Sequence, residues 1–169
     1  HTSKTYEDLL TNVKSAGLKV TPVKPGLEIG LAEEVTGIFL SPPASSYEGL
    51  NNYSAVLKLT YQDTSFLFTG DAEAEVEKEL LASGVDLSST VLKAAHHGSN
   101  SSTTTNFLQA VRPKIAVISV GHDNTYGHPS SKVINRLEKA HVQVFRTDAH
   151  GTIVLASDGH DVTVTTDKD

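Results

Sequence analysis

Short runs of alternating apolar and polar residues make up most of this chain, and one helical segment precedes them. Residues 5–17 keep their leucines and valine on one face and end at Gly17, a pattern that predicts a helix. Strands are predicted next at 18–23, 27–31 and 35–40, with a Pro-Gly turn at 25–26 and a Ser/Pro-rich loop, rather than a domain linker, at 41–49.

The centre of the chain alternates strand patterns with helix patterns. Residues 53–61 and 64–69 predict a hairpin that turns at Gln62-Asp63. The elements predicted after it are an acidic helix at 72–83, a strand at 90–95, a polar loop at 100–105, a helix at 106–112, a buried strand at 114–120, a glycine-containing loop at 121–129, a helix at 130–140 and closing strands at 142–146, 151–156 and 161–166. This order predicts a layered α/β or α+β fold, with helices on the sheet faces and ligands beyond the carboxyl ends of the strands.

Length and charge narrow the classes of protein. The 169 residues suit a single domain, 1–169, or part of a larger one. With a net charge of −6 and no basic run among its 14 Lys and Arg residues, the sequence gives no sign of tight, static nucleic-acid binding. The absence of Cys excludes thiolate-zinc sites and disulfides, and no apolar stretch approaches the length of a membrane span. Because the chain also lacks Met, we expect it to be cut from something longer.

Metal-binding residue types follow two of the predicted strands. Asp71 comes directly after the strand at 64–69 and Gly70, and His96-His97 follow the strand at 90–95. Two such strands lying side by side would bring carboxylate and imidazole ligands to one edge of a sheet, as in a catalytic divalent-metal site. Asp71 is also a favourable cap for the helix that follows, and the two functions are compatible.

The histidine pair and the two residues after it have separate expected roles. At the end of a strand, His96 and His97 should point to opposite sides, so that one binds a metal while the other packs or supports it. Gly98 would let the backbone approach a ligand closely, and Ser99 could donate to a substrate oxygen or cap the next segment.

A third histidine, His128, lies in the predicted loop at 121–129. Pro129 suits the first turn of a helix and would fix His128 at the mouth of that helix, although the same residues also suit a plain turn. Tyr126 could be a proton donor or a ring at the edge of the core. We expect the other histidines of this half of the chain, His122, His141, His150 and His160, to be structural or exposed. Asp123 and Asp148 are possible ligands without further support. The acidic residues of the predicted helix at 72–83 are expected to form a solvated surface: Glu73, Glu75, Glu77 and Glu79.

Other hydrolase chemistries find no support in the sequence. It contains no G-x-S-x-G turn, no thiol nucleophile and no glycine-rich phosphate loop.

With Thr69-Gly70-Asp71, His96-His97-Gly98-Ser99 and Tyr126-Gly127-His128-Pro129 in this order, the chain resembles the metallo-β-lactamase superfamily from about residue 51 to 151. Within that superfamily it is similar to the ComEC-type hydrolase domains of DNA-uptake competence proteins. The resemblance implies a four-layer αββα sandwich with a metal site at one edge of its paired sheets. It also implies hydrolysis of a phosphodiester, with DNA as the substrate during competence.

The resemblance implies roles for individual residues. Asp71 would bridge two metals and act in catalysis with His128, and one histidine of the pair, taken as His96, would bind metal with His97 beside it. The cofactor would be one or two divalent ions, Zn²⁺ or Mn²⁺, which supply hydroxide and stabilise phosphoryl charge. The residues expected to contact the substrate are Ser99, Asn124, Tyr126 and His128.

The chain departs from the family pattern in its ligand set. The H-x-H-x-D-H motif is absent from the sequence, His1 belongs to no such cluster, and Tyr53 stands where many relatives carry a further His. We therefore expect residues 1–169 to be the C-terminal portion of such a domain, which alone would bind metal weakly.

Three functions remain in competition: a metal-dependent phosphodiesterase or nuclease, a non-catalytic or incomplete module of the same fold, and a hydrolase of small esters such as lactones or phosphocholine. The resemblance further implies a membrane channel domain in the same longer protein. It places the domain on the extracytoplasmic face of the membrane, or outside the cell.

Overall fold

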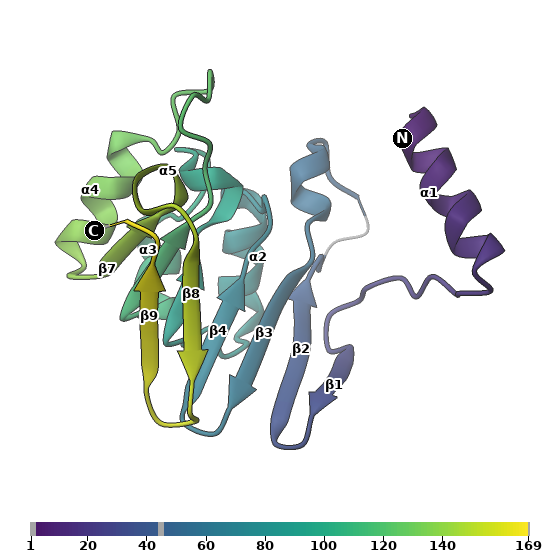
Figure 1. Cartoon of the computed structure of the whole chain (residues 1–169), viewed down its shortest axis with the longest axis horizontal. Helices are drawn as coiled ribbons and strands as arrows, with labels where there is room; N and C mark the ends of the chain where they lie inside the picture. Colours follow the sequence, from purple (N-terminus) through teal and green to yellow (C-terminus); the bar gives the residue numbers. More distant parts are fainter. Residues whose placement is uncertain (1–2, 44–45, 169) are drawn as a thin grey trace.

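One large sheet dominates the fold, in a computed structural model that describes residues 3–43 and 46–168. Its strands follow the chain order: β1 (Glu28–Ala32), β2 (Val35–Ser41), β3 (Val56–Tyr61), β4 (Thr64–Phe68), β5 (Val91–Lys93), β6 (Ile115–Ile118) and β7 (Gln143–Arg146). Pairing is antiparallel from β1 to β4 and parallel from β4 to β7 (Figure 1). The parallel half therefore brings the ends of β4, β5 and β6 to one edge of the sheet.

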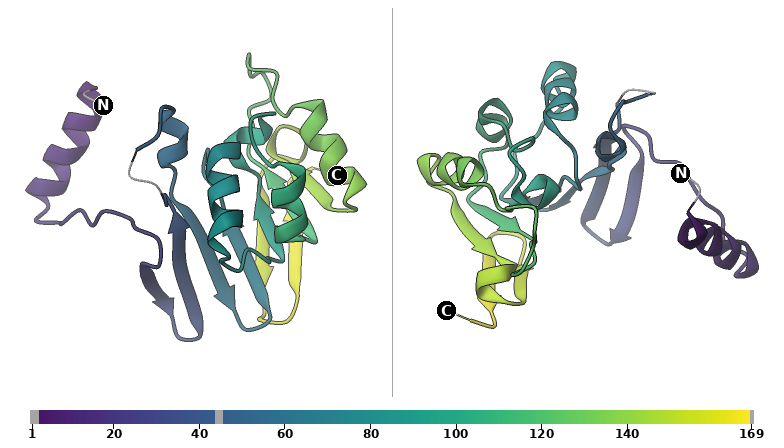
Figure 2. Two further views of the ribbon diagram at one scale, coloured as in Figure 1. Left: turned by 180° about the vertical axis from the view of Figure 1, so that it is seen from behind. Right: turned by 90° about the horizontal axis from the view of Figure 1, so that it is seen from above.

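Helices cover one face of this sheet and a hairpin covers part of the other. The helices are α2 (Ala74–Ser83), α3 (Thr105–Val111) and α4 (Ser131–Lys139), and the hairpin is β8 (Ile153–Ser157) with β9 (Val162–Thr166). Figure 2 shows the helices and the hairpin on opposite sides of the sheet. Phe107, Leu80 and Leu137 from the helices pack on Leu67 and Leu92 from the strands to form the core.

The observed layers confirm the predicted fold class, a mixed α/β domain with a large sheet. Of the expected αββα order, the described residues supply a helix layer and two sheets. On the hairpin side, Thr64 and Ser157 hold the sheets together through hydroxyls 2.6 Å apart. Within residues 3–43 and 46–168, no helix is long and apolar enough to cross a membrane.

The N-terminal segment differs from the prediction. The expected helix forms as α1 (Lys4–Ser15), but none of its side chains is buried and it stands away from the sheet (Figure 1). The strand predicted at 18–23 is wrong, because these residues have no regular structure and are mostly exposed. Alternation indicates a half-buried strand only where a neighbouring strand offers hydrogen bonds, and here β1 is the edge of the sheet.

Smaller corrections concern boundaries. Residues 53–55 precede β3 rather than belonging to it, because Leu50–Tyr53 form a 3₁₀ turn. The helix predicted from residue 72 begins at Ala74, with Glu73 in the N-cap position, so Asp71 is not its cap. A short helix, α5 (Thr147–His150), lies between β7 and β8 and was not predicted. His1 lies outside the described residues.

An ion pair under the sheet makes the stability of the fold depend on pH. The ammonium of Lys58, on β3, is largely buried and donates to the Asp86 carboxylate at 2.7 Å and to the Asp86 carbonyl at 3.1 Å. The hydrogen bond from Lys58 lowers the pKa of Asp86 to about 2. A lowered folded-state pKa means that the stabilisation is present above the usual pKa of Asp, near 3.8, and is lost as pH falls toward 2.

We therefore predict that Asp86→Asn lowers the free energy of unfolding by about 1 kcal/mol at pH 6, a modest value because Asp86 is 73% exposed. The difference from the wild type should shrink between pH 4 and pH 2 in denaturant titrations. Asp8→Asn is the matched control, because Asp8 pairs with Lys4 entirely on the surface and its loss should cost about 0.5 kcal/mol or less. A gap for Asp86→Asn that does not change with pH would contradict the assignment.

Candidate functional site

Three loops meet at the carboxyl edge of the parallel strands. Asp71 follows β4, His96 and His97 follow β5, and the loop 119–130 follows β6. The backbone joins the first two loops, since the His96 N–H donates to the Gly70 carbonyl at 3.0 Å. The structure thus brings together the segments that the sequence placed at one sheet edge, because parallel strands present the same end to the same side.

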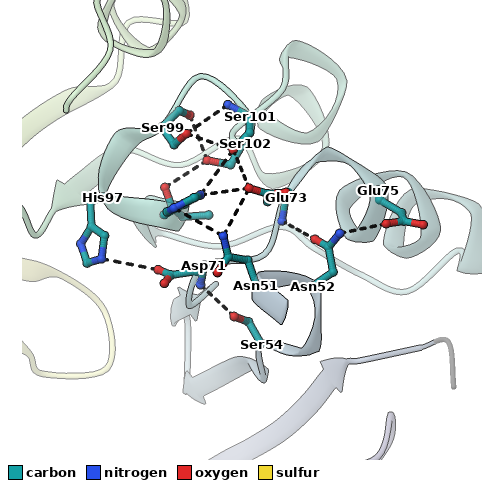
Figure 3. A network of polar contacts seen from close by, with 12 residues as sticks. Asn51, Asn52, Ser54, Asp71, Glu73, Glu75, His97, Ser99, Ser101 and Ser102 are labelled. Atoms are coloured by element: carbon teal, nitrogen blue, oxygen red, sulfur yellow. Dashed lines mark hydrogen bonds and ion pairs between the residues drawn. The ribbon is translucent and has the colours of Figure 1, made fainter. Parts of the chain in front are cut away.

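His97 and Asp71 form the exposed pair at this edge. His97 Nε2 lies 3.6 Å from Asp71 Oδ1, and the two side chains are 50% and 40% exposed (Figure 3). His97 Nδ1 lies 2.7 Å from the Ser119 carbonyl oxygen, which can only accept, so Nδ1 carries the proton of the neutral ring. The lone pair of Nε2 then faces the carboxylate, and this arrangement suits a metal ion between the two atoms.

The spacing of this pair fits a metal ion. Ligand atoms bound at about 2.1 Å with a tetrahedral angle lie about 3.4 Å apart, close to the 3.6 Å found here. A carbonyl that holds the other ring nitrogen is also the usual support of a metal-binding histidine. The pair can therefore hold one divalent ion from one side.

His96 is held in a different network. Its Nδ1 lies 3.1 Å from Glu73 Oε1 and 3.4 Å from the Ser101 hydroxyl, and its Nε2 lies 3.5 Å from the Asn51 amide. Ser101 and Asn51 both donate to the same Glu73 oxygen, at 2.9 and 3.4 Å, and in Figure 3 they converge on it. Glu73 is thus a polar partner at the edge of the site. Sequence reasoning missed it, although its place two residues after Asp71 was the available signal.

The two histidines do not alternate as residues of a strand would. Both have left-handed backbone angles, with φ of 47° and 54°, in a short 3₁₀ turn spanning Ala95–Gly98. Their ring centroids lie 6.4 Å apart, and each ring faces its own carboxylate. The prediction that they point to opposite sides assumed extended geometry, which this turn does not have. That one of them binds a metal while the other packs or supports the metal site stays a prediction.

The acidic helix α2 is not the solvated surface that the sequence indicated. Glu77 is 2% exposed and accepts hydrogen bonds from the Thr103 and Thr104 N–H groups. Burial raises its pKa, while the hydrogen bonds from Thr104 act in the opposite direction. Glu75 and Glu79 are also bound, to the Asn52 amide and the Tyr47 hydroxyl.

Glu77 and Arg136 fix the loop 99–104 from two sides. The Arg136 guanidinium, from α4, donates to the Ser102 and Thr103 carbonyls, opposite the N–H groups that Glu77 accepts. Thr103 has a φ of 51°, a left-handed angle that is costly for a β-branched residue. The loop that carries Ser101 is therefore held in place by charged side chains against its own backbone strain.

His128 reaches the site from the loop after β6. Its ring centroid lies 5.7 Å from that of His96, and Tyr126 stacks on its other side with centroids 6.0 Å apart. Burial, followed by the nearby His96 and His97, lowers the pKa of His128. Tyr126 is 81% exposed, so the core-edge alternative is wrong and its hydroxyl is open to solvent.

The predicted substrate residues Asn124 and Ser99 are engaged within the protein. The Asn124 amide donates to the Gly121 and His128 carbonyls and accepts from the His128 N–H, so it shapes the loop. Ser99 is nearly buried, and its hydroxyl lies 3.0 Å from that of Ser101. Substrate contact by these two residues stays a prediction.

Gly98 lets two loops of the site approach each other. Its φ is 80°, and a Cβ there would lie 2.7 Å from the Pro129 Cβ. The Ser130 N–H donates to its carbonyl at 2.9 Å. The close approach predicted for this glycine is therefore to the loop that carries His128.

The remaining candidates lie outside this group. Asp123 pairs with its neighbour His122 on the surface, and Asp148 is taken up by Arg146. His141 and His160 are exposed, and His150 binds the backbone of Arg146. Across residues 3–43 and 46–168, no three His, Asp or Glu side chains converge as a metal cluster, so the two pairs described above are what this part of the chain brings to the edge.

Comparison with known proteins gives this arrangement a family. The sequence matches the Metallo-beta-lactamase superfamily over residues 5–122. The chain belongs to this superfamily. Its members are generally hydrolases and usually bind divalent metals, which suits an edge made of paired His and carboxylate residues.

Three relatives of the chain, one of them a competence protein by name, match it over two thirds of its length or more. It is 37% identical over 147 residues to ComE operon protein 3 of Bacillus subtilis, covering 87% of this chain and 19% of that protein. It is 38% identical over 116 residues to competence protein ComA of Neisseria gonorrhoeae, covering 68% and 17%. Recombination protein 2 of Haemophilus influenzae is 34% identical over 114 residues, covering 68% and 14%.

These relatives confirm the resemblance to ComEC-type metallo-β-lactamase domains. The chain spans less than a fifth of the length of each.

Proposed function

We propose that this chain contributes the Asp71 side of a divalent-metal phosphodiesterase site that hydrolyses DNA during competence. The observation that carries the proposal is the His97–Asp71 pair, in which a lone pair of a ring fixed by Ser119 faces a carboxylate at 3.6 Å. Superfamily membership and the names of the relatives support a hydrolase with a role in competence.

The residues of the edge divide the work of such a reaction. His97 and Asp71 would hold one divalent ion, Zn²⁺ or Mn²⁺, which when bound would supply an activated water and neutralise charge on the phosphoryl oxygens. His128 stands beside them with a ring that can donate a hydrogen bond to a phosphate oxygen. Tyr126, stacked on His128, offers a hydroxyl and a ring face to the substrate from the solvent side.

The shape of the edge favours a polymeric substrate over a small ester. The hollow between His97, Val120 and His128 measures about 180 Å³. Pockets that enclose a small molecule usually have volumes of about 300–1,000 Å³. A shallow, half-exposed edge instead suits a strand that crosses it, which argues against a lactone or phosphocholine substrate.

The proposal extends to the protein that contains this domain. We propose that the domain acts on the extracytoplasmic face of the membrane, beside a membrane channel domain of the same longer protein. The resemblance to ComEC-type domains motivates this setting, and the names of the relatives support a DNA-related role in competence. Degradation of a DNA strand next to a channel would couple hydrolysis to uptake.

Binding of Mn²⁺ and Zn²⁺ to the 169-residue chain tests the metal assignment. We expect His97→Asn to weaken metal binding by about 10- to 100-fold, the cost typical of disturbing the environment of a bound metal. His96→Asn should cost less than 10-fold, because His96 already binds Glu73, Ser101 and Asn51. Calorimetric titration with each metal measures both values, and His122→Asn serves as the exposed control.

Hydrolysis is measured in parallel with a labelled single-stranded oligonucleotide, with metal and with EDTA. Metal-stimulated cleavage that falls with His97→Asn supports the proposal. A folded chain that shows neither metal binding nor cleavage would support the non-catalytic module instead. A larger loss of affinity for His96→Asn than for His97→Asn would return the ligand role to His96.

A further inference from the structure

A cationic groove is lined by residues of α3, of α4 and of the segments that follow these two helices. Its volume is about 650 Å³, more than three times that of the hollow at the His97 edge. Leu108, Pro113 and Val142 supply apolar lining, and no carboxylate contributes to it. The cations that line it are Arg112, Arg136 and Lys139.

The charge of this region opposes that of the whole chain. Residues 99–146 contain six Lys or Arg and two Asp or Glu, a net charge of +4, whereas the rest of the chain contains eight and eighteen, a net charge of −10. The sequence shows no basic run because these cations are spaced along helices and loops. The fold gathers three of them, Arg112, Arg136 and Lys139, around one groove.

Two of the lining cations are uncompensated. Arg112 and Lys139 are exposed, and neither forms a side-chain hydrogen bond or ion pair with any residue in the described parts of the chain. Both lie at helix C-termini, where a cation is favourable by a few tenths of a kcal/mol to about 1 kcal/mol. That effect explains a positive charge at these positions but not an apolar, carboxylate-free groove between them.

Arg136 connects the groove with the candidate site. Its guanidinium binds the Ser102 and Thr103 carbonyls and the Asn100 side chain, so it lies against the loop 99–104. The same loop carries Ser101, which bonds to Glu73 beside His96. The groove therefore adjoins the loop at the candidate site through Arg136, which contributes to both.

We propose that this groove binds single-stranded DNA, with phosphates on the exposed Arg112 and Lys139 and bases over the apolar floor to which the buried Leu108 and Pro113 contribute. The inference rests on the proposed function and names a second contact surface for the same substrate. A guanidinium can bind a phosphate through two parallel hydrogen bonds. The apolar lining can contact the faces of DNA bases, and an acidic peptide has no such flat rings to offer. Contact between base faces and an apolar lining requires unpaired bases, which a single strand offers and a duplex does not.

The double variant Arg112→Gln/Lys139→Gln tests this surface. Affinity for a fluorescent single-stranded oligonucleotide is measured by anisotropy in EDTA, so that no hydrolysis occurs. We expect the variant to bind about 10-fold more weakly. We also expect the slope of log K against log salt concentration to fall by about 1.4, the value for two lost phosphate contacts. Lys14→Gln/Lys78→Gln removes the same charge from exposed sites elsewhere and should change affinity less than twofold.

A charge-conserving variant, a folding check and a peptide competitor complete the experiment. The charge-conserving pair Arg112→Lys/Lys139→Arg should recover most of the affinity, and circular dichroism checks that every variant is folded. Equal weakening by the control pair, unchanged affinity in the groove variant, or no binding by the wild type would overturn the inference. A poly-glutamate peptide that binds the groove more tightly than DNA would also overturn it and identify an acidic protein segment as the occupant.

A small substrate separates this inference from the proposed function. Hydrolysis of bis(p-nitrophenyl) phosphate with Mn²⁺ needs the edge but not the groove, so the groove variant should retain wild-type turnover of it. Groove-dependent DNA binding without any hydrolysis would leave the groove assignment standing and remove the proposed activity. Hydrolysis together with DNA binding that does not depend on the groove would support the proposed activity and overturn the groove assignment.

Discussion

Asp71→Asn should reduce metal-stimulated DNA hydrolysis about 100-fold and leave the melting temperature within about 2 °C of the wild type. Among the described residues, His97 is the one ion-pair partner of the Asp71 carboxylate, which also interacts electrostatically with Lys93. The substitution removes the negative ligand from the pair. The backbone N–H of Asp71 donates to the Ser54 hydroxyl, a contact that the variant keeps. Initial rates with a labelled oligonucleotide and a thermal melt provide the two measurements.

The small effect on stability separates a functional carboxylate from a structural one. If Asp71 capped α2, its replacement would shorten or loosen that helix, but the N-cap position belongs to Glu73. Asp123→Asn is the matched control, because Asp123 is exposed and pairs only with its neighbour His122. Normal hydrolysis by Asp71→Asn would exclude Asp71 as a metal ligand, and a marked loss of stability would assign it a structural role.

Glu77→Ala should lower the free energy of unfolding by about 3 kcal/mol, the largest stability effect that we expect in this chain. The change leaves the Thr103 and Thr104 N–H groups without their acceptor and creates space under the loop 99–104. The wild type also bears the cost of desolvating the Glu77 carboxylate, which raises the pKa of Glu77, and the variant is relieved of that cost. Urea titrations at neutral pH measure the difference.

Two variants provide comparison for this prediction. Glu77→Gln supplies one acceptor oxygen and turns an amide NH₂ toward the second N–H, so it should cost about 1–2 kcal/mol. Glu75→Ala removes an exposed carboxylate that binds only the Asn52 side chain and should cost less than 1 kcal/mol. If Glu75→Ala were as damaging as Glu77→Ala, the loop would not depend on Glu77.

The parallel half of the sheet could be predicted from the sequence, because its strands are apolar runs separated by segments of helical period. That order alone placed Asp71, His96 and His97 at one edge. The strand predicted at 18–23 failed because a two-residue alternation says nothing about whether a partner strand is available. The pattern describes one strand, whereas a sheet requires two.

The interior of the site could not be predicted from residue types. Glu73, Glu75, Glu77 and Glu79 form one acidic pattern in the sequence, yet only Glu77 lies under the loop 99–104, whose path depends on tertiary packing. The proposal that His97 rather than His96 is the metal ligand likewise rests on the Ser119 carbonyl. Ser119 follows β6 and lies more than twenty residues away in the sequence. These contacts are non-local, so no local pattern contains them.

Gly98 allows the imidazoles of His96 and His128 to lie in contact. Because it has no side chain, the backbone of Pro129 can lie against it, and His128 is drawn to 5.7 Å from His96. The edge-to-face contact of the two rings therefore depends on a position behind the site that touches neither ring. A side chain at residue 98 would push the two loops apart, and would move His128 away from His96 without replacing either histidine.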